Sequence, residues 1–369
     1  MVVLVSAWRG LVSPFVEQYY YLAGGSVPLL GALEGALELS TMLPPLLGLL
    51  AIRRLGLWHA IVLSTLLDLA GLGLLLSGSP PLVLASIAVW SLSRMRTPAI
   101  KSAIAHVSER RGQAFGLVET ATGVASAACP ALASLALVAL GTLTGLRLLT
   151  AVALALSFAS LLVAVSGLRG LAYLARGSGG SARQHLRALK RGLRALRAPL
   201  LAFVLLEGVE GLGYLYPIVA VDYGCEPWLW GLAVSASVFV STPAPVLAGR
   251  LLDEASDKAA PVRAFMACLA LLFACSFALP SYFWALYVAV VFCGTALHAL
   301  ANAYVAYTCG AGEREEVYAA LDSLGAAAAS LVAPVAGLIY AAHRASIFLV
   351  GAASASIAAA LLREPADSN

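Results

Sequence analysis

The stretch ERRGQAFGLVETATGVASAACPALAS, residues 109–134, decides the fold because its pattern occurs twice in the chain. A basic turn opens a long apolar segment that carries one carboxylate, then small residues, then a proline. Residues 314–337, REEVYAALDSLGAAAASLVAPVAG, repeat the pattern roughly 203 positions later. The matched pairs are Arg111 with Arg314, Phe115 with Tyr318, Glu119 with Asp322, and Thr120 with Ser323. The pattern predicts two copies of one half.

A second set of matches supports the same duplication. Pro14 pairs with Pro217, Gly31 with Gly231, and Pro45 with Pro245, all at an offset near 200.

The composition indicates a membrane protein. Hydrophobic residues make up 61% of the chain and charged residues 11%, with a mean hydropathy of +0.91. Soluble domains average roughly 45–50% and about 25% respectively, so this much apolar surface has no aqueous fold in which to be buried. The net charge of +4 comes from basic residues in short loops between apolar runs, and predicts no nucleic-acid partner.

Apolar runs of about 20 residues predict an all-α polytopic membrane protein with twelve transmembrane helices. They cover residues 2–23, 27–50, 57–77, 80–105, 113–140, 146–168, 199–222, 227–250, 262–279, 283–309, 316–340 and 344–362. The repeat groups them into two six-helix bundles, residues 1–168 and 199–369, related by a pseudo-two-fold axis along the membrane normal. Residues 169–198 form the connector between the bundles.

The basic residues predict the orientation. The loops after the second, fourth, sixth, eighth and tenth spans hold Arg53, Arg54, Arg110, Arg111, the basic cluster of residues 169–197, Lys258, Arg263 and Arg314. The opposite loops hold only Arg147 and Arg344. We therefore expect a multi-pass protein of the cytoplasmic membrane, with both termini in the cytoplasm.

The connector contains a predicted basic amphipathic helix. From Arg183 to Arg197, leucines recur along one face and arginines cover the others. Such a helix is expected to lie on the inner leaflet among anionic lipid headgroups. Aromatic residues at predicted outer helix ends, including Tyr19, Tyr20 and Trp230, are expected in an interfacial belt.

The twelve spans, their six-plus-six repeat and the long middle loop resemble the major facilitator superfamily of secondary transporters. The best local match is residues 96–133, with an arginine-bearing fourth span, a basic turn and a fifth span of small residues ending on proline. The family's loop signature after the second span survives in part as GLLAIRRLG, residues 48–56. The equivalent loop after the eighth span, GRLLDEASDK, retains the glycine and the aspartate of the signature as Gly249 and Asp253. The antiporter signature of the fifth span is matched at Pro130, without its glycines. The resemblance implies alternating access and a coupling arginine on the fourth span.

Polar residues inside the predicted spans indicate a cavity. An ionisable group at bilayer depth costs about 2.5–3.5 kcal/mol unless it is paired or hydrated. The candidate substrate and proton cavity comprises Arg9, Glu17, Glu34, Glu38, Asp68, Arg94, Arg96, Glu207, Glu210, His298 and Asn302. Glu207 and Glu210 share a helix face, as do His298 and Asn302.

Several of these residues have a structural alternative. Arg94 or Arg96 could pair with Asp68 as a bridge within the first bundle, or could compete with substrate for a carboxylate. His298 could be a helix-packing residue or a proton relay. Because acids outnumber bases, we expect a proton-coupled carrier of a cationic or neutral amphiphilic solute, similar to drug or metabolite efflux. The alternative is a uniporter or symporter of an anionic metabolite that uses Arg9, Arg94 and Arg96.

A second candidate set lies nearer the cytoplasm. In the family, the second span packs on the eleventh and the fifth on the eighth. By resemblance, Asp322 would face Arg53 or Arg54, and Glu119 would face Arg250. We expect these pairs, with Asp253 nearby, to act as a cytoplasmic gate; alternatively, each acid pairs within its own helical neighbourhood.

Other classes of function have little support in the sequence. No HExxH, GxSxG, Walker or CxxC pattern occurs, so we predict no enzyme, no cofactor and no metal site. Scattered acids without a second intramembrane histidine argue against a metal, and the six cysteines read as small apolar residues. The third class is a transporter-like sensor or scaffold, and the embedded charges argue against it. The expected state is a monomer that binds a small-molecule substrate, protons and lipid.

Overall fold

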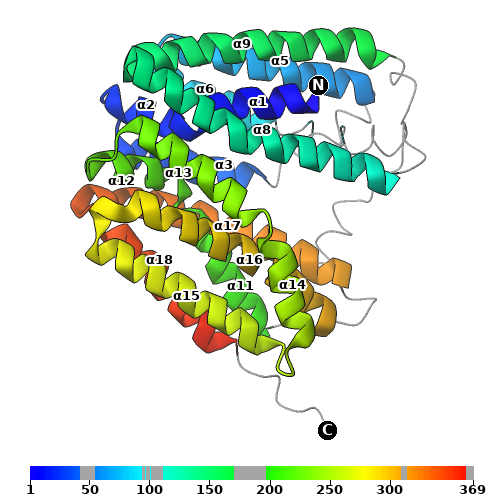
Figure 1. The fold of residues 1–369 in the computed structure, drawn as a ribbon, viewed down its shortest axis with the longest axis vertical. Coiled ribbons are helices and arrows are strands. Elements are labelled where there is room, and N and C mark those ends of the chain that lie inside the picture. Colours follow the sequence, from blue (N-terminus) through cyan, green and yellow to red (C-terminus); the bar gives the residue numbers. More distant parts are fainter. Residues whose placement is uncertain are drawn as a thin grey trace. The chain divides into compact units, whose positions relative to one another are not determined.

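The computed structural model describes residues 1–41, 55–93, 96, 100, 111–169, 197–308 and 314–362, and every element in these ranges is helical. The elements of the first half are α1 (Val2–Val12), η1 (Ser13–Phe15), α2 (Val16–Leu22), α3 (Val27–Thr41), α5 (Leu57–Leu76), α6 (Pro80–Ser93), α8 (Arg111–Leu140) and α9 (Thr142–Gly167). Those of the second half are α11 (Arg197–Glu210), η3 (Gly213–Leu215), α12 (Tyr216–Asp222), α13 (Pro227–Ser241), α14 (Ala244–Glu254), α15 (Ala259–Ala278), η4 (Pro280–Tyr282), α16 (Phe283–Thr308), α17 (Arg314–Ala342) and α18 (Ser346–Leu361). Figure 1 shows them in chain order.

Within these ranges, eight helical segments are long and apolar enough to cross a membrane. They are Leu57–Leu76, Ala121–Leu140, Thr142–Gly167, Leu201–Asp222, Pro227–Glu254, Ala259–Ala278, Pro280–Val305 and Leu324–Ala342. Shorter apolar helices occupy Val27–Leu37, Pro80–Ser93 and Ser346–Leu361. The chain is thus a helical multi-pass membrane protein, while the number of twelve spans and the pseudo-two-fold axis stay predictions.

The first and seventh predicted spans are not continuous helices. A 3₁₀ turn interrupts each at the same place in its half, at Ser13–Phe15 and at Gly213–Leu215. Pro14 lies inside the first turn and Pro217 lies two residues after the second, at the start of α12. A proline inside a helix removes one backbone hydrogen bond and disfavours helical backbone at the residue before it. The span predicted at residues 199–222 is found as Leu201–Asp222, and the structure adds a 3₁₀ turn within it and within the range predicted at residues 2–23.

The repeat is also visible in the backbone where these segments end. Gly24 and Gly224 have φ angles of 86° and 87°, in the left-handed region. The amides of Gly24 and Gly25 donate to the carbonyls of Tyr21 and Tyr20, and those of Gly224 and Cys225 to Val221 and Ala220. This hydrogen-bonding pattern is the Schellman motif, which ends a helix on a left-handed glycine.

We predict that Gly24→Ala and Gly224→Ala each lower the stability by about 1–2 kcal/mol, because an L side chain resists the left-handed backbone. A β-carbon would meet no atom within 4 Å at either glycine, so the effect reports backbone strain alone. The matched control is Gly73→Ala, which also points into open space but lies inside α5. That change should leave the unfolding temperature in detergent unchanged or raise it. Equal effects at all three positions would contradict the argument.

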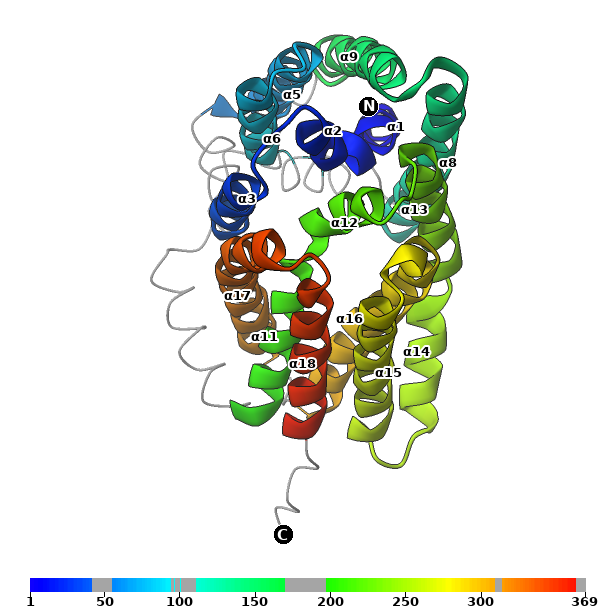
Figure 2. The same cartoon turned by 90° about the vertical axis from the view of Figure 1, so that its left-hand side faces the viewer.

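The structure divides into two compact units. Unit 1 holds Met1–Ser26, the described part of Leu39–Gly179, and Glu226–Ser235. Unit 2 holds Val27–Glu38, the described part of Gly180–Cys225, and the described part of Ala236–Asn369. In unit 1, α1 packs on α8 and α9, and α5 packs on α6 and α9; in unit 2, α18 packs on α11 and α15, and α16 on α14 and α15. Figure 2 shows α11, α18 and α15 alongside one another.

Each unit therefore includes a short segment from the other half of the sequence. In unit 2, a β-carbon on Gly31 of α3 would lie 2.9 Å from the carbonyl oxygen of Ala333 in α17. In unit 1, a β-carbon on Gly231 of α13 would lie 2.5 Å from the ring of Phe15 and 2.2 Å from the Ser134 hydroxyl. The matched glycines Gly31 and Gly231 thus serve the same purpose, because each allows one helix to approach another closely.

Candidate functional site

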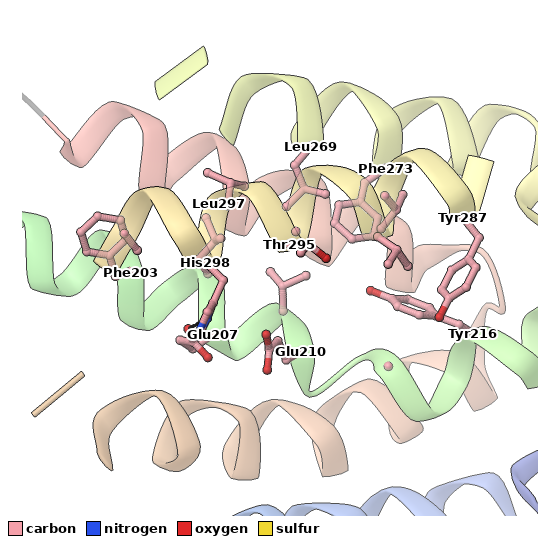
Figure 3. A pocket seen from close by; sticks show the side chains of 17 residues that line it. Phe203, Glu207, Glu210, Tyr216, Leu269, Phe273, Tyr287, Thr295, Leu297 and His298 are labelled. Carbon is pink, nitrogen blue, oxygen red and sulfur yellow. Dashed lines mark ion pairs between the residues drawn. The ribbon is translucent and has the colours of Figure 1, made fainter. Parts of the chain in front are cut away.

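A carboxylate–imidazole cluster lies in unit 2. Glu207 and Glu210 occupy the last turn of α11, three residues apart on one face, and His298 projects toward them from α16 (Figure 3). Glu207 Oε1 lies 3.5 Å from His298 Nδ1. One ligand atom from each of the three side chains lies within 4.8 Å of the others. The sequence predicts that the two glutamates share one helix face, and the structure shows that His298 lies next to them.

The packing around Glu207 fixes its direction. A β-carbon on Gly325 of α17 would lie 2.8 Å from both Cβ and Cγ of Glu207, so only glycine leaves room behind this side chain. Phe203, one turn before Glu207, packs against Tyr304 of α16 with ring centroids 5.9 Å apart. These two contacts hold α11 between α16 and α17 with its carboxylates facing α16.

The cluster borders a cavity of about 310 Å³ that lies entirely within unit 2. Its other end is aromatic: Tyr216 packs against Tyr287 and Phe273 with ring centroids 5.9 Å and 6.5 Å apart (Figure 3). None of the described residues that line the cavity is a lysine or an arginine. An acidic end and an aromatic end suit an organic cation, because ring faces and carboxylates both attract positive charge.

An adjoining cavity extends the polar end. Thr295 and Asn302 line it together with Glu210 and His298. Thr295, His298 and Asn302 follow one face of α16 at helical spacing, so their polar atoms continue the cluster along the helix.

A second charged cluster lies in unit 1. Asp68 of α5 is fully buried; its carboxylate accepts a hydrogen bond from the buried Arg96 and lies 3.7 Å from the Arg9 guanidinium. Arg9 also donates to the hydroxyl of Ser93, at 3.1 Å. The structure thus brings together Arg9, Asp68 and Arg96, while Arg94 lies outside the described residues.

Two tryptophans pack on the Arg9 side of this cluster. The Arg9 guanidinium lies 5.4 Å from the ring centroid of Trp8, and Trp8 packs against Trp90 at 5.3 Å. The pairing of Arg96 with Asp68 is the geometry that the structural alternative predicts, because either charge alone would be costly to bury. The one excess positive charge of the three side chains keeps the anionic alternative open.

The other candidate cavity residues are not gathered at either cluster. Glu17 lies in the first turn of α2, half-buried. Glu34 of α3 is also half-buried and interacts electrostatically with Tyr214 in unit 2. The Glu38 side chain lies outside the described part of the structure.

The predicted gate is described only in part. Asp253 accepts a hydrogen bond of 2.6 Å from the Tyr307 hydroxyl, and this bond raises the pKa of Tyr307. Lys258 lies over the Tyr307 ring at 4.8 Å and donates to the carbonyls of Leu252 and Asp253, at the end of α14. Arg250 is exposed on α14.

The remaining gate residues lie outside the described part of the structure: Arg53, Arg54 and the side chains of Glu119 and Asp322. The proposed pairs of Asp322 with Arg53 or Arg54, and of Glu119 with Arg250, therefore stay predictions. So does the basic helix between Arg183 and Arg197, of which only Arg197, the first residue of α11, is described.

Sequence reasoning missed the aromatic end of the cavity. Tyr287 lies on the same face of α16 as His298, eleven residues or about three turns away, and Phe203 lies one turn before Glu207. Helical periodicity counted outward from the charged residues could have found both. Tyr216 follows the break at Gly213–Leu215, so no periodicity within α11 predicts its direction.

Comparison with known proteins gives the fold. No protein-family model matches the chain, and no curated protein matches its sequence. Among solved structures, the nucleoside transporter NupG is similar with a TM-score of 0.77, 14% identity, and coverage of 98% of this chain and 96% of that one. The peptide transporter POT in complex with sulfate is similar with a TM-score of 0.72, 14% identity, and coverage of 98% of this chain and 92% of that one. The human organic anion transporter MFSD10 is similar with a TM-score of 0.60, 17% identity, and coverage of 98% of this chain and 97% of that one. This chain has the fold of the major facilitator superfamily of transporters, the family that its sequence resembles.

Proposed function

We propose that this protein is a secondary active transporter that moves a small cationic or neutral amphiphilic organic solute across the cytoplasmic membrane by alternating access, coupled to protons. The observation that carries the proposal is the cavity of unit 2, with carboxylates at one end and aromatic rings at the other. Transporters with the same fold, including NupG and POT, support transport over catalysis.

The proposed coupling follows from the chemistry of the acidic end. A carboxylate in a membrane interior is stable when it binds a proton or a cation, and not when it is left bare. Protons and a cationic solute would compete for the oxygens of Glu207 and Glu210. A carrier of this kind exchanges solute for protons, which corresponds to efflux. The cytoplasmic termini, the monomeric state and the lipid contact of the connector belong to the same proposal.

The test is uptake of a radiolabelled aromatic amine into proteoliposomes with an acidic lumen. We expect accumulation that collapses when the proton gradient is dissipated, and a loss of at least tenfold in Glu207→Gln and Glu210→Gln. Each substitution removes one negative charge while keeping the shape of the side chain. The matched control is Glu254→Gln, an exposed carboxylate at the end of α14, which should transport normally.

Three outcomes would contradict parts of the proposal. Uptake that ignores the gradient would remove the proton coupling. Transport of anionic metabolites that depends on Arg9 and Arg96 would favour the alternative substrate class. An absence of counterflow with any tested solute would favour a transporter-like sensor.

A further inference from the structure

We infer that Glu207, Glu210 and His298 form a binding site for a divalent transition-metal ion of the zinc class. The inference goes beyond the proposed function, because these side chains would bind such an ion whether or not an organic solute is transported. No metal site is predicted from the sequence, in which the two glutamates and the histidine lie about 90 residues apart and match no metal-binding motif. The fold of unit 2 removes that objection by placing α16 opposite the last turn of α11.

The geometry is near that of a coordination site. A four-coordinate ion with bonds of about 2.0–2.2 Å holds its ligand atoms roughly 3.3–3.6 Å apart. Glu207 Oε1 and His298 Nδ1 are already 3.5 Å apart, and the three ligand atoms lie within 4.8 Å of one another. Glu210 needs only a rotation of its flexible side chain to complete the set.

The charge of the cluster favours a cation. Even with His298 protonated, these three side chains carry one net negative charge. No lysine or arginine is among the described residues that line either cavity at the cluster. A divalent ion would balance both carboxylates and leave the imidazole neutral, which is the form that binds metals.

The donor set selects the class of ion. One imidazole nitrogen with two carboxylate oxygens suits zinc and its first-row neighbours. Calcium takes six to eight oxygen ligands and magnesium keeps most of its waters, so neither fits this set as well. The His298 side chain is 60% exposed and that of Glu207 31%, which leaves room for an ion to enter and for a water ligand. Asn302 and Thr295 border the same space and offer further oxygens.

The test is isothermal titration of the full-length protein in detergent with Zn²⁺, after removal of any affinity tag. We expect one ion per chain, and an affinity at least tenfold lower in His298→Ala and in Glu210→Gln. The matched control is His343→Ala, an exposed histidine that contacts Ser346 outside the cluster, which should bind as the wild type does. Visible absorption of the Co²⁺-loaded protein gives a second readout, with intense bands expected for four-coordinate metal.

Each other result overturns the inference. The site would be ruled out if the folded wild type bound no Zn²⁺, or if both variants bound Zn²⁺ as tightly as the wild type. Binding lost in Cys268→Ser instead would place the ion at the thiols of Cys268 and Cys293, whose Sγ atoms lie 3.6 Å apart. Unfolding temperatures measured without metal show whether a variant is folded. Amine uptake measured with a metal chelator present tests the transport proposal separately, so either can fail alone.

Discussion

Replacing Asp68 with alanine should destabilise unit 1 by about 3–5 kcal/mol, because the change leaves buried positive charge without its counter-ion. Asp68 is fully buried and Arg96 is 4% exposed, so water cannot replace the lost carboxylate. Arg9 would lose its second partner in the same step, since its guanidinium lies 3.7 Å from Asp68. The measurement is the unfolding midpoint of the purified protein in detergent.

The control separates this effect from that of losing any carboxylate. Asp253→Ala removes an exposed acid that is hydrogen-bonded to Tyr307, and should cost no more than about 1 kcal/mol. The double variant Asp68→Ala with Arg96→Met removes both buried charges, and should recover much of the lost stability. If Asp68→Ala were as stable as the control variant, the buried pair would have no structural role.

The unit 1 result also bears on the substrate. If Arg96 serves mainly to neutralise Asp68, the double variant should keep transporting a cationic amine while it regains stability. If Arg96 binds an anionic solute, the double variant should regain stability but lose transport of that anionic solute. The alternative left open by the sequence is thereby decided by two measurements on one variant.

The helices of this protein could largely be predicted from its sequence, because hydropathy reflects the surrounding lipid directly. The span predicted at residues 57–77 is observed as Leu57–Leu76, and that at 113–140 as Arg111–Leu140. The breaks at Ser13–Phe15 and Gly213–Leu215 could also have been predicted, since a proline at a matched position in each half signals them. Counting apolar residues alone does not detect such a break, because the count does not consider the backbone effect of proline.

The site could be predicted only within single helices. The i, i+3 spacing puts Glu207 and Glu210 on one face, whereas the approach of His298 depends on tertiary packing that no local pattern encodes. The position of Trp230 was predicted from the sequence, and the prediction was wrong. It was expected in an interfacial belt, but it is 2% exposed and its indole N–H donates to the Pro14 carbonyl at 3.1 Å. The belt rule is a statistical tendency, and a buried hydrogen-bond acceptor overrides it.

Replacing Gly35 with leucine should separate α3 from α17 and cost about 3 kcal/mol or more, because no side chain fits between these helices. A β-carbon at Gly35 would lie 2.6 Å from the Ser330 carbonyl oxygen and 2.7 Å from the Pro334 ring. Both neighbours are rigid, since one is helix backbone and the other a proline ring, so neither can rotate away as a long side chain would.

The reason for this close approach lies in the sequence of α17. Pro334 has no amide hydrogen, so the Ser330 carbonyl receives no helical hydrogen bond from position 334. The Cα hydrogens of Gly35 can face that carbonyl, and such contacts are typical of small residues at membrane helix interfaces. The matched control is Gly123→Leu in α8, where a β-carbon meets no atom within 4 Å; this variant should unfold at the wild-type temperature. If the two variants lost equal stability, close packing of α3 on α17 would not be what this glycine provides.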